Sequence, residues 1–360
     1  MAQNLPERAE VVIVGGGFAG AATAYALGEA GVGDVVLVER EAGFGYHASG
    51  RNAALGRQLV EDERFTDLTA RGAAFLRDPP AEFSEAPLWR PVGSLLLADD
   101  EGEVEAMCRR AERRGIACER MSMAAASARV PYLGGAPGAG GIYVPGDGVI
   151  DVHALLMGFL RGARRRGVRL ALGCEVVGVE REGERLRVFT ERGAVLARCV
   201  VVAGGAWAAQ VAALAGARDP GLVPIRRHLF VTEPIADLDP ELPFVWHLGA
   251  DEFYLRPEGS GLLLSACDEQ ASEPGAVATQ PEALETLAEK LARVAPRLGS
   301  IGVARSWACQ RTFAPDRRPV IGWDREVPGL FWVAGLGGHG ATSSYAIGAE
   351  AAAAIRTELG

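Results

Sequence analysis

Residues 10–20 read Glu-Val-Val-Ile-Val-Gly-Gly-Gly-Phe-Ala-Gly, and this stretch decides the fold. The apolar run predicts a buried strand over Glu10–Val14, and the small residues after the glycines predict a helix through Ala21–Ala30. A second apolar run predicts a strand over Asp34–Val38. A strand, a tight glycine turn, a helix and a parallel strand in this order form one βαβ unit.

Three glycines of this stretch have the spacing of a dinucleotide-binding turn. Gly15 permits the tight turn, Gly17 lets the backbone approach a pyrophosphate, and Gly20 lets the helix pack closely on the strand. The N-terminus of the helix supplies N–H groups for the phosphates. Glu39 ends the second strand, about twenty residues on, where a carboxylate accepts hydrogen bonds from the adenosine ribose. The fingerprint alone does not distinguish FAD from a nicotinamide cofactor.

Three further segments favour FAD, the longer of the two cofactors. The segment Ser49–Asn52 follows Glu39 at a distance suited to a second pass along the cofactor, and Gly204–Trp207 follows an apolar strand. The glycine-rich segment Gly335–Gly340 lies between the last strand and the last helix. The N-terminus of that helix is therefore placed to stabilise negative charge on a reduced flavin.

The rest of the sequence alternates between helical and strand patterns. Helices are predicted at Arg64–Arg77, Glu101–Arg114, Val152–Arg166, Pro281–Ala295 and His339–Arg356. Strands are predicted at Gly93–Ala98, Val168–Leu172, Val176–Glu180, Ala197–Ala203, repeatedly between residues 223 and 266, and at Val303–Thr312 and Leu330–Gly335. These patterns predict an α/β protein with a discontinuous FAD-binding domain of the Rossmann type (1–55, 146–218 and 318–360). The remaining segments (56–145 and 219–317) predict a substrate-binding domain built on a mixed, largely antiparallel sheet.

Composition excludes several classes of function. The chain has 360 residues and a formal net charge of −9, which argues against a general affinity for nucleic acid. The six cysteines form no Cys-x-x-Cys pair, so no zinc site is expected. No apolar run approaches the roughly 20 residues that cross a bilayer, and the N-terminus has no signal-peptide pattern. The expected compartment is the cytoplasm.

With these segments in view, the chain resembles the D-amino acid oxidase superfamily, in particular its bacterial D-arginine and D-amino acid dehydrogenase branch. The resemblance covers essentially the full length. The motifs that carry it are Gly45–Arg51, Asp78–Pro80, Phe159–Gly162, Gly204–Trp207, Arg226–Arg227, Phe253–Leu255, Trp307–Arg311 and Phe331–Ala334.

The resemblance implies a role for each matching residue at the substrate. Arg311 corresponds to the arginine that binds the substrate carboxylate, a task suited to the planar guanidinium. Tyr254 matches a tyrosine that assists through its hydroxyl, and Arg227 matches an arginine of the same cavity. Gly338 would offer its backbone carbonyl to the substrate amine. His339 would either stabilise negative charge near the flavin or simply pack.

The glycine fingerprint and the resemblance together give the expected cofactor contacts. They are Gly15, Gly17, Phe18, Ala19, Gly20, Glu39, Arg40, Ala48, Ser49, Arg51, Asn52, Ala53, Val176, Ala203, Gly204, Gly205, Trp207, Gly337, Gly338, His339, Gly340, Ala341 and Thr342. Cys309 has a spacing similar to that of a cysteine that holds FAD covalently in monomeric sarcosine oxidase. Its surroundings instead fit the branch with noncovalent FAD, which is the expectation here.

Two departures from the branch concern the substrate side chain. Ser94 stands where the D-arginine enzyme has a glutamate for the substrate guanidinium, and Leu55-Gly56 replaces a His-Tyr pair. Ser94 and Leu55 are therefore expected at the side-chain pocket. A cationic side chain would be buried there largely unpaired, which is costly. The expected substrate is a small neutral or apolar D-amino acid.

The expected reaction is oxidative deamination by hydride transfer to FAD, giving an imino acid that water hydrolyses to a 2-oxo acid and ammonia. The alternatives are a glycine- or sarcosine-type secondary-amine oxidase, a 2-hydroxy acid dehydrogenase, and a flavin-binding subunit without turnover. The electron acceptor is either oxygen or a quinone-type molecule. The single lysine, Lys290, lies in the polar phase of a predicted helix and is expected to be exposed, which favours a dehydrogenase.

Overall fold

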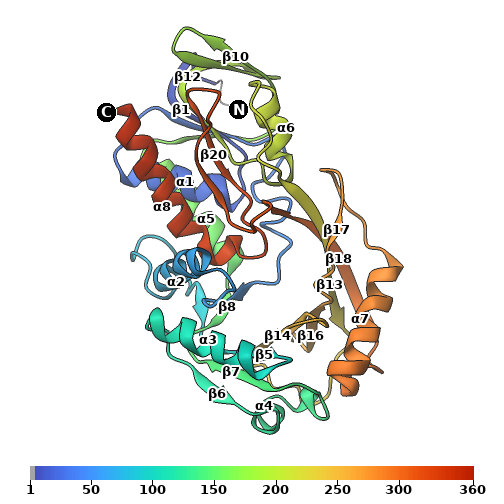
Figure 1. The fold of residues 1–360 in the computed structure, drawn as a ribbon. Coiled ribbons are helices and arrows are strands. Elements are labelled where there is room, and N and C mark those ends of the chain that lie inside the picture. The colour runs from blue at the N-terminus through green and yellow to red at the C-terminus, as the bar shows by residue number, and fades with distance from the viewer. Residues whose placement is uncertain (1–4) are drawn as a thin grey trace.

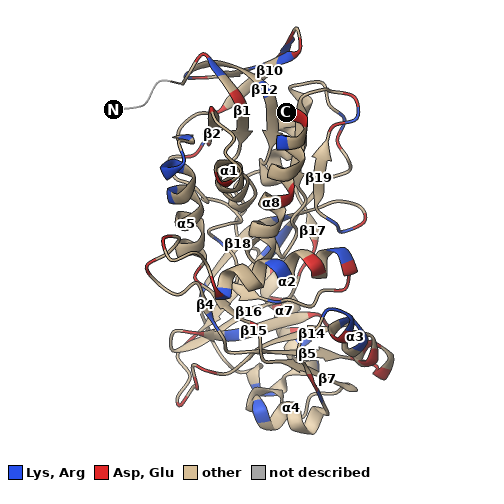
Figure 2. Cartoon of the chain, turned by 90° about the vertical axis from the view of Figure 1, so that its left-hand side faces the viewer, with Lys and Arg blue, Asp and Glu red and all other residues tan. Residues whose placement is uncertain are grey.

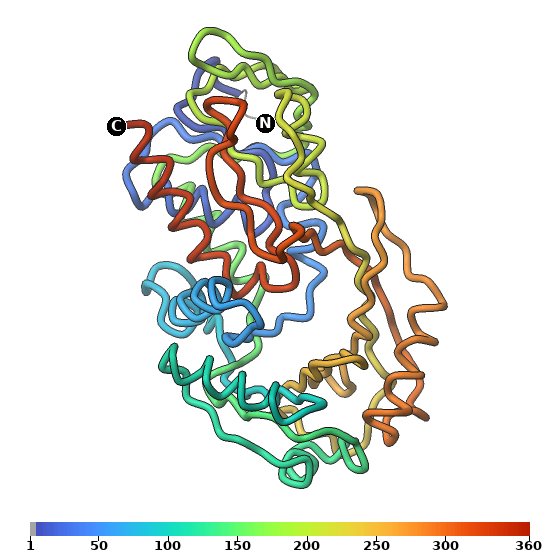
Figure 3. Tube along the Cα trace, in the orientation of Figure 1, coloured from blue at the N-terminus to red at the C-terminus, as the bar shows by residue number. Residues whose placement is uncertain are grey.

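The computed structural model describes residues 5–360. Figure 1 shows one large sheet with its helices at the top of the molecule and a second large sheet at the bottom. The N-terminal and C-terminal parts of the described chain pack together in the upper part, where the blue trace of helix α1 (Phe18–Glu29) runs beside the red trace of α8 (Gly340–Leu359) (Figure 3).

The upper sheet has eight strands, of which six run in the order β10-β11-β12-β1-β2-β9. These strands are β1 (Arg8–Val14), β2 (Val35–Val38), β9 (Arg169–Ala171), β10 (Val176–Glu182), β11 (Arg185–Thr190) and β12 (Gly193–Val202), with β20 (Leu330–Ala334) beside β12 and β19 (Val320–Trp323) beside β20. Strand β1 pairs in parallel with β2 and with β12, so the predicted βαβ unit is confirmed. All four residues of β2 are buried, as expected of a parallel strand covered on both faces.

Helix α1 packs against α8 and α5 (Val152–Arg165). It begins at Phe18 rather than at the predicted Ala21, because Gly17 is already its N-terminal cap. The approach of α1 to α8 depends on small residues: a Cβ on Gly348 would lie 2.6 Å from the backbone carbon of Ala22. The close approach of the two helices therefore requires a glycine at position 348.

The lower sheet has nine strands and is antiparallel except where β14 runs parallel to β5. The strands are β5 (Ser94–Ala98), β6 (Glu119–Met121), β7 (Gly140–Val144), β13 (Val223–Thr232), β14 (Phe244–Leu248), β15 (Phe253–Glu258), β16 (Gly261–Ser265), β17 (Gln270–Ala271) and β18 (Val303–Phe313). Helices α3 (Glu101–Arg113), α4 (Met123–Arg129) and α7 (Pro281–Val294) lie around this sheet (Figure 1). The expected fold class is confirmed.

A three-stranded sheet of short strands was not anticipated from the sequence. It consists of β3 (Leu55–Gly56), β8 (Gly148–Ile150) and β4 (Trp89–Arg90). Near it, α2 (Glu63–Arg77) packs against α8, although the two helices were assigned to different domains. The predicted domain boundaries therefore remain a prediction. A short helix, α6 (Ala208–Ala213), completes the upper part.

Charged residues of both signs are interspersed along the helices and loops (Figure 2). Among residues 5–360, no helix is both long enough and apolar enough to cross a bilayer. In the same range, no group of three or more His, Cys, Asp or Glu side chains gathers in a way that could hold a metal ion.

Candidate active site

A cavity of about 440 Å³ is lined by residues of both large sheets. At one end it is lined by the glycine turn after β1, the end of β2 and the segment after β12. At the other end it is lined by residues of β13, β14, β15 and β18. The segment 45–55 contributes to its wall, as does the segment before α8. The cavity is therefore elongated, with one end suited to a nucleotide and another formed by the lower sheet.

The glycine turn leaves no room for side chains. Gly15 has a φ of +111°, and a Cβ there would lie 2.4 Å from the carbonyl oxygen of Ala203. A Cβ on Gly17 would lie 2.9 Å from Oγ of Ser49, and one on Gly20 would lie 1.9 Å from the carbonyl oxygen of Gly15. The backbone is thereby exposed to the cavity next to the N-terminus of α1, which is the environment that a pyrophosphate requires.

The carboxylate of Glu39 is held at the end of β2 by two backbone donors. Its oxygens accept hydrogen bonds from the N–H of Gly16 at 2.7 Å and from the N–H of Glu41 at 2.9 Å. Nearby, the Arg40 guanidinium stacks 3.8 Å from the centre of a ring of Trp207. Glu39, Arg40 and Trp207 all line the cavity, as expected of residues around an adenosine.

Most of the predicted cofactor residues line this one cavity. They are Gly15, Gly17, Phe18, Ala19, Glu39, Arg40, Ala48, Ser49, Arg51, Asn52, Ala53, Val176, Ala203, Gly204, Gly205, Trp207, Gly337, Gly338, Gly340 and Ala341. Gly20, His339 and Thr342 do not line it. Gly20 acts through packing, and Thr342 is buried with its hydroxyl donating to the carbonyl of Leu55 at 3.3 Å.

Two arginines from neighbouring strands face the other end of the cavity. In the β13–β18 pairing, Arg227 lies opposite Cys309, two residues from Arg311, so both arginines project from the same face of the sheet. Each is only 6–7 % exposed. Nη1 of Arg311 donates to the carbonyl of Ala48 at 3.4 Å, and Nε of Arg227 donates to the carbonyl of Asp268 at 3.0 Å.

Tyr254 and Trp246 complete this end of the cavity. Their rings are 4.9 Å apart, on the paired strands β15 and β14. Burial raises the pKa of Tyr254 to about 12, so its hydroxyl remains a hydrogen-bond donor at neutral pH. The sequence did not single out Trp246, since an aromatic residue in a strand is an ordinary packing signal.

The charges of the cavity differ between its ends. Among its described lining residues, the acidic side chains are Glu39 and Glu175, both at the nucleotide end. The other end holds the two guanidiniums of Arg311 and Arg227, although Arg227 also pairs at 3.4 Å with Glu269, which does not line the cavity. Two guanidiniums and a phenolic donor form a site suited to a carboxylate.

His339 packs rather than facing the cavity. Its ring lies 5.1 Å from that of Phe65 and 6.0 Å from that of Trp246. Burial, assisted by the nearby Arg57 guanidinium, lowers the pKa of His339 to about 3. The imidazole is therefore neutral at physiological pH. Of the two roles considered for His339, the geometry favours packing.

Ser94 does not contribute to the side-chain pocket, contrary to expectation. It is fully buried, and its hydroxyl donates to Oδ2 of Asp147 at 2.7 Å, away from the cavity. The physical reason is that both faces of β5 are buried. A buried side chain of this strand can therefore point away from the substrate cavity. Leu55 does line the cavity, as expected.

Comparison with known proteins decides the family. The family model described as FAD dependent oxidoreductase (DAO) matches residues 10–354. The chain belongs to this family. Its cofactor is FAD, and the glycine turn, the Glu39 carboxylate and the adjoining helix N-terminus fit that molecule. The expected superfamily and cofactor are confirmed.

Individual relatives extend the comparison. The chain is 28% identical to mouse sarcosine dehydrogenase over 359 residues, which cover 94% of this chain and 38% of that protein. It is 30% identical to sarcosine oxidase subunit beta of Rhizobium meliloti over 324 residues, covering 87% of this chain and 76% of the relative. The chain thus spans only about two fifths of the mouse protein.

Solved structures show the same fold over nearly the whole chain. L-Proline dehydrogenase from P. horikoshii superposes with a TM-score of 0.87 at 25% identity, covering 98% of this chain and 95% of the other. Glycine oxidase from Geobacillus kaustophilus gives a TM-score of 0.82 at 23% identity, with the same coverages.

Cys309 of this FAD-dependent oxidoreductase is buried at the wall of the cavity, with its thiol 3.7 Å from the carbonyl oxygen of Arg227. We expect noncovalent FAD. Acid precipitation of the purified protein is therefore expected to leave a yellow supernatant and a colourless pellet. Yellow colour that stays in the wild-type pellet but not in that of Cys309→Ser would show a covalent bond instead.

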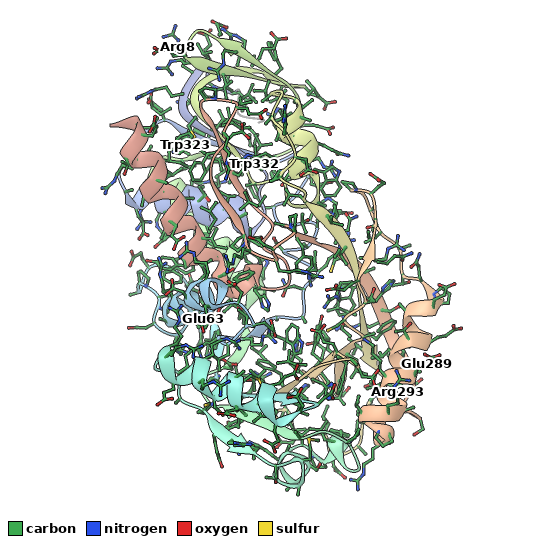
Figure 4. The ribbon with its side chains drawn as sticks, in the orientation of Figure 1. Arg8, Glu63, Glu289, Arg293, Trp323 and Trp332 are labelled. Carbon is green, nitrogen blue, oxygen red and sulfur yellow. The ribbon has the colours of Figure 1, made fainter. Side chains whose placement is uncertain are left out.

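Lys290 is not a free, exposed lysine, which corrects the sequence-based expectation. It lies on α7, whose outer residues Glu289 and Arg293 are labelled in Figure 4. Its ammonium donates to the carbonyl oxygens of Glu252 at 2.9 Å and Ala266 at 2.7 Å. The long aliphatic stem lets the charge reach these inner carbonyls from a polar helix face. Lys290 is therefore not among the residues that line the cavity.

Asp147, which Ser94 contacts, gives a testable pH dependence of stability. Burial raises the pKa of Asp147 from 3.8 to about 6, although Ser94 and Gln58 donate hydrogen bonds to it. The folded state thus binds this proton more tightly than the unfolded state does. The contribution of Asp147 to the free energy of unfolding therefore falls as pH rises from about 4 to 6, and is constant above that range.

Asp147→Asn removes this titration and preserves hydrogen-bonding partners for Ser94 and Gln58. The difference in unfolding free energy, variant minus wild type, is expected to rise by about 2 kcal/mol between pH 4 and pH 7. Urea titrations at both pH values measure it. A difference that is the same at both pH values would show that Asp147 has an ordinary pKa.

Proposed function

We propose that this protein oxidises a small amino acid with a secondary amine, such as N-methylglycine or a cyclic imino acid, at a carbon next to the nitrogen. The proposal adopts the alternative of a sarcosine-type secondary-amine oxidase that the sequence left open, and not the oxidation of a D-amino acid. It draws on the relatives named as sarcosine and dimethylglycine dehydrogenases and on the fold shared with an L-proline dehydrogenase. The observation that carries it is the carboxylate site formed by Arg311, Arg227 and Tyr254 at the end of the FAD cavity.

Each residue of this site has a role in binding. Arg311 and Arg227 pair with the substrate carboxylate, and the Tyr254 hydroxyl donates to it. Two fixed cations orient the substrate as well as bind it, and orientation accounts for much of the acceleration when a reacting carbon must approach a single atom. The carbonyl of Gly338 is proposed to accept the amine N–H.

The wall near this site is apolar. Leu55 and Trp246 line the cavity beside Tyr254, and Trp246 is backed by Arg57, whose guanidinium carbon lies 4.1 Å from the ring centre. We propose that Leu55 and Trp246 contact the N-substituent and exclude water from it. Such a wall accepts a methyl group or a pyrrolidine ring, and offers no partner to a charged side chain.

Bound FAD supplies a hydride acceptor. The substrate loses a hydride from the carbon next to nitrogen and becomes an iminium, which water hydrolyses to a carbonyl compound and an amine. The amine must be neutral for its lone pair to assist. With pKa values of about 12 and about 3, Tyr254 and His339 are unsuited as bases near neutrality, so the amine releases its proton to water before reaction.

A substrate panel tests the proposal. With an artificial dye as acceptor, N-methylglycine or L-proline is expected to give a kcat/KM at least about 10-fold above those of glycine, D-alanine and D-methionine. A difference of this size corresponds to about 1.4 kcal/mol of transition-state binding. Higher values for D-alanine or D-methionine would restore the D-amino acid reading. Turnover of glycolate or D-lactate instead would indicate a 2-hydroxy acid dehydrogenase.

A further inference from the structure

A second hollow, of about 620 Å³, lies beside the FAD cavity. Its wall includes residues 50–52 and Ala54, the strand residues around Trp307, and residues 277–279. Four residues line both spaces: Arg51, Asn52, Ala54 and Val277. The two spaces are therefore separated by the thickness of single residues.

Residues 272–280, here called the strap, form part of this partition. The strap connects β17 to α7. Gly275 and Val277 line the FAD cavity together with Arg227 and Arg311, whereas Val277, Ala278 and Thr279 line the second hollow. The strap thus lies between the outer hollow and the carboxylate site.

One end of the strap is attached through the side chain of Gln310. Its amide nitrogen donates to Oγ of Ser272 at 2.9 Å and to the carbonyl of Glu273 at 2.6 Å, and its amide oxygen accepts from the N–H of Gly275 at 3.1 Å. Gln310 is itself buried and lines the cavity next to Arg311. The Gln310 side chain therefore contacts three residues of this end, which is also held by a backbone hydrogen bond from the N–H of Ser272 to the carbonyl of Pro224 at 2.9 Å.

The other end of the strap is attached through His228. Nε2 of His228 accepts a hydrogen bond from the N–H of Gln280 at 3.0 Å, so Nδ1 must carry the proton that is shared with Asp268 at 2.7 Å. The carbonyl of Asp268 also accepts from Arg227. Side-chain anchors of this kind can be broken one at a time, unlike a strand held in a sheet by consecutive backbone pairs.

The charge of the second hollow suits a ligand that bears a carboxylate, such as an amino acid or a small anion. Among the described residues that line it are Arg51, Arg256 and Arg305 but a single acidic residue, Glu258, which pairs with both Arg256 and Arg305. Arg305 has 60 % of its side chain exposed. An excess of positive charge at the mouth of a cavity raises the rate at which anions enter it.

We propose that the second hollow is the entrance to the active site and that the strap is its movable wall. Bound FAD would fill the nucleotide end of the cavity, so the substrate must enter the cavity by a route at the end that contains Arg311 and Arg227. Val277 lines both the FAD cavity and the second hollow, so the route between the two spaces passes this residue. The inference rests on the proposed function only in placing the site of reaction beside Arg311 and Arg227.

Sulfite is the probe, because this small anion adds reversibly to an oxidised flavin and bleaches it without being turned over. Stopped-flow absorbance of the FAD-loaded protein gives its association and dissociation rates. Ala278→Trp fills the hollow without touching the cavity. We expect both rates to fall about 10-fold or more while the dissociation constant stays within twofold, because a barrier on the route slows both directions equally.

Ala271→Trp is the matched control, since Ala271 is exposed on β17 but lines neither space. It should leave both rates unchanged. Arg305→Ala should lower the association rate about threefold at low salt and have no effect at high salt. Unchanged sulfite rates in Ala278→Trp would overturn the proposal that the second hollow is the entrance. Equal changes of these rates in Ala278→Trp and Ala271→Trp would also overturn it.

Hydrogen exchange tests the strap separately. Gln310→Ala should speed exchange at the N–H of Gly275 at least 10-fold and accelerate sulfite dissociation. Exchange at Gly275 that is the same in Gln310→Ala and wild type would contradict a strap held by this side chain. Neither readout uses the substrate, so a failure of the proposed secondary-amine chemistry would show in the substrate panel and leave these rates unaffected.

Discussion

Arg311→Met is expected to lower kcat/KM for the preferred amino acid by about 10³-fold. The substitution removes the guanidinium but keeps an unbranched side chain of similar length. The loss corresponds to about 4 kcal/mol, within the range for removing one partner of a buried charge pair. The loss of kcat/KM should persist when the assay contains saturating FAD, and the flavin content of the purified variant should equal that of the wild type. The loss would then reflect substrate binding and not loss of the cofactor.

Two controls accompany this prediction. Arg226→Met changes the neighbouring arginine of β13, which lies outside the cavity and hydrogen-bonds Gln270. It is expected to change kcat/KM less than threefold. Arg311→Lys keeps the charge but not the two parallel donors and should recover only part of the activity. A loss below 10-fold in Arg311→Met would show that the substrate carboxylate binds elsewhere.

Gly15→Ala is expected to abolish FAD binding. The added Cβ would lie 2.4 Å from the carbonyl oxygen of Ala203, and the φ of +111° is one that side-chain-bearing residues rarely adopt. The backbone must therefore move where it approaches the pyrophosphate. The purified variant should contain less than about a tenth of the wild-type flavin, measured by absorbance after denaturation, and should have a lower Tm.

Gly33→Ala is the control, because Gly33 lies in the same βαβ unit and a Cβ there would meet no atom within 4 Å. It should retain full flavin and a Tm close to that of the wild type. If Gly15→Ala also retained stoichiometric FAD, the glycine turn would not be the pyrophosphate site.

Local patterns in the sequence were sufficient for the nucleotide half. The turn at Gly15–Gly20 and the carboxylate of Glu39 are separated by a single strand and helix, so their arrangement follows from local chemistry. Arg311, Arg227 and Tyr254 come from distant segments, and their meeting was expected only from the family resemblance. The β13–β18 and β15 strands bring them together.

Long-range packing explains what the sequence did not reveal. The short strands β3, β4 and β8 have at most three residues each, too few for a periodic signal. Ser94 lies in a strand buried on both faces, where alternation does not indicate which side faces the ligand. Trp246 is recognised as part of the site only when β14 is placed beside Tyr254.

Anaerobic reduction of the FAD-loaded protein tests the central claim most directly. One equivalent of N-methylglycine or L-proline per flavin is expected to bleach the wild-type absorbance near 450 nm, while Arg311→Met stays yellow on the same timescale. Wild-type protein that remained yellow with excess N-methylglycine, L-proline and D-alanine would contradict the account, and would instead describe a flavin-binding chain without amino acid turnover.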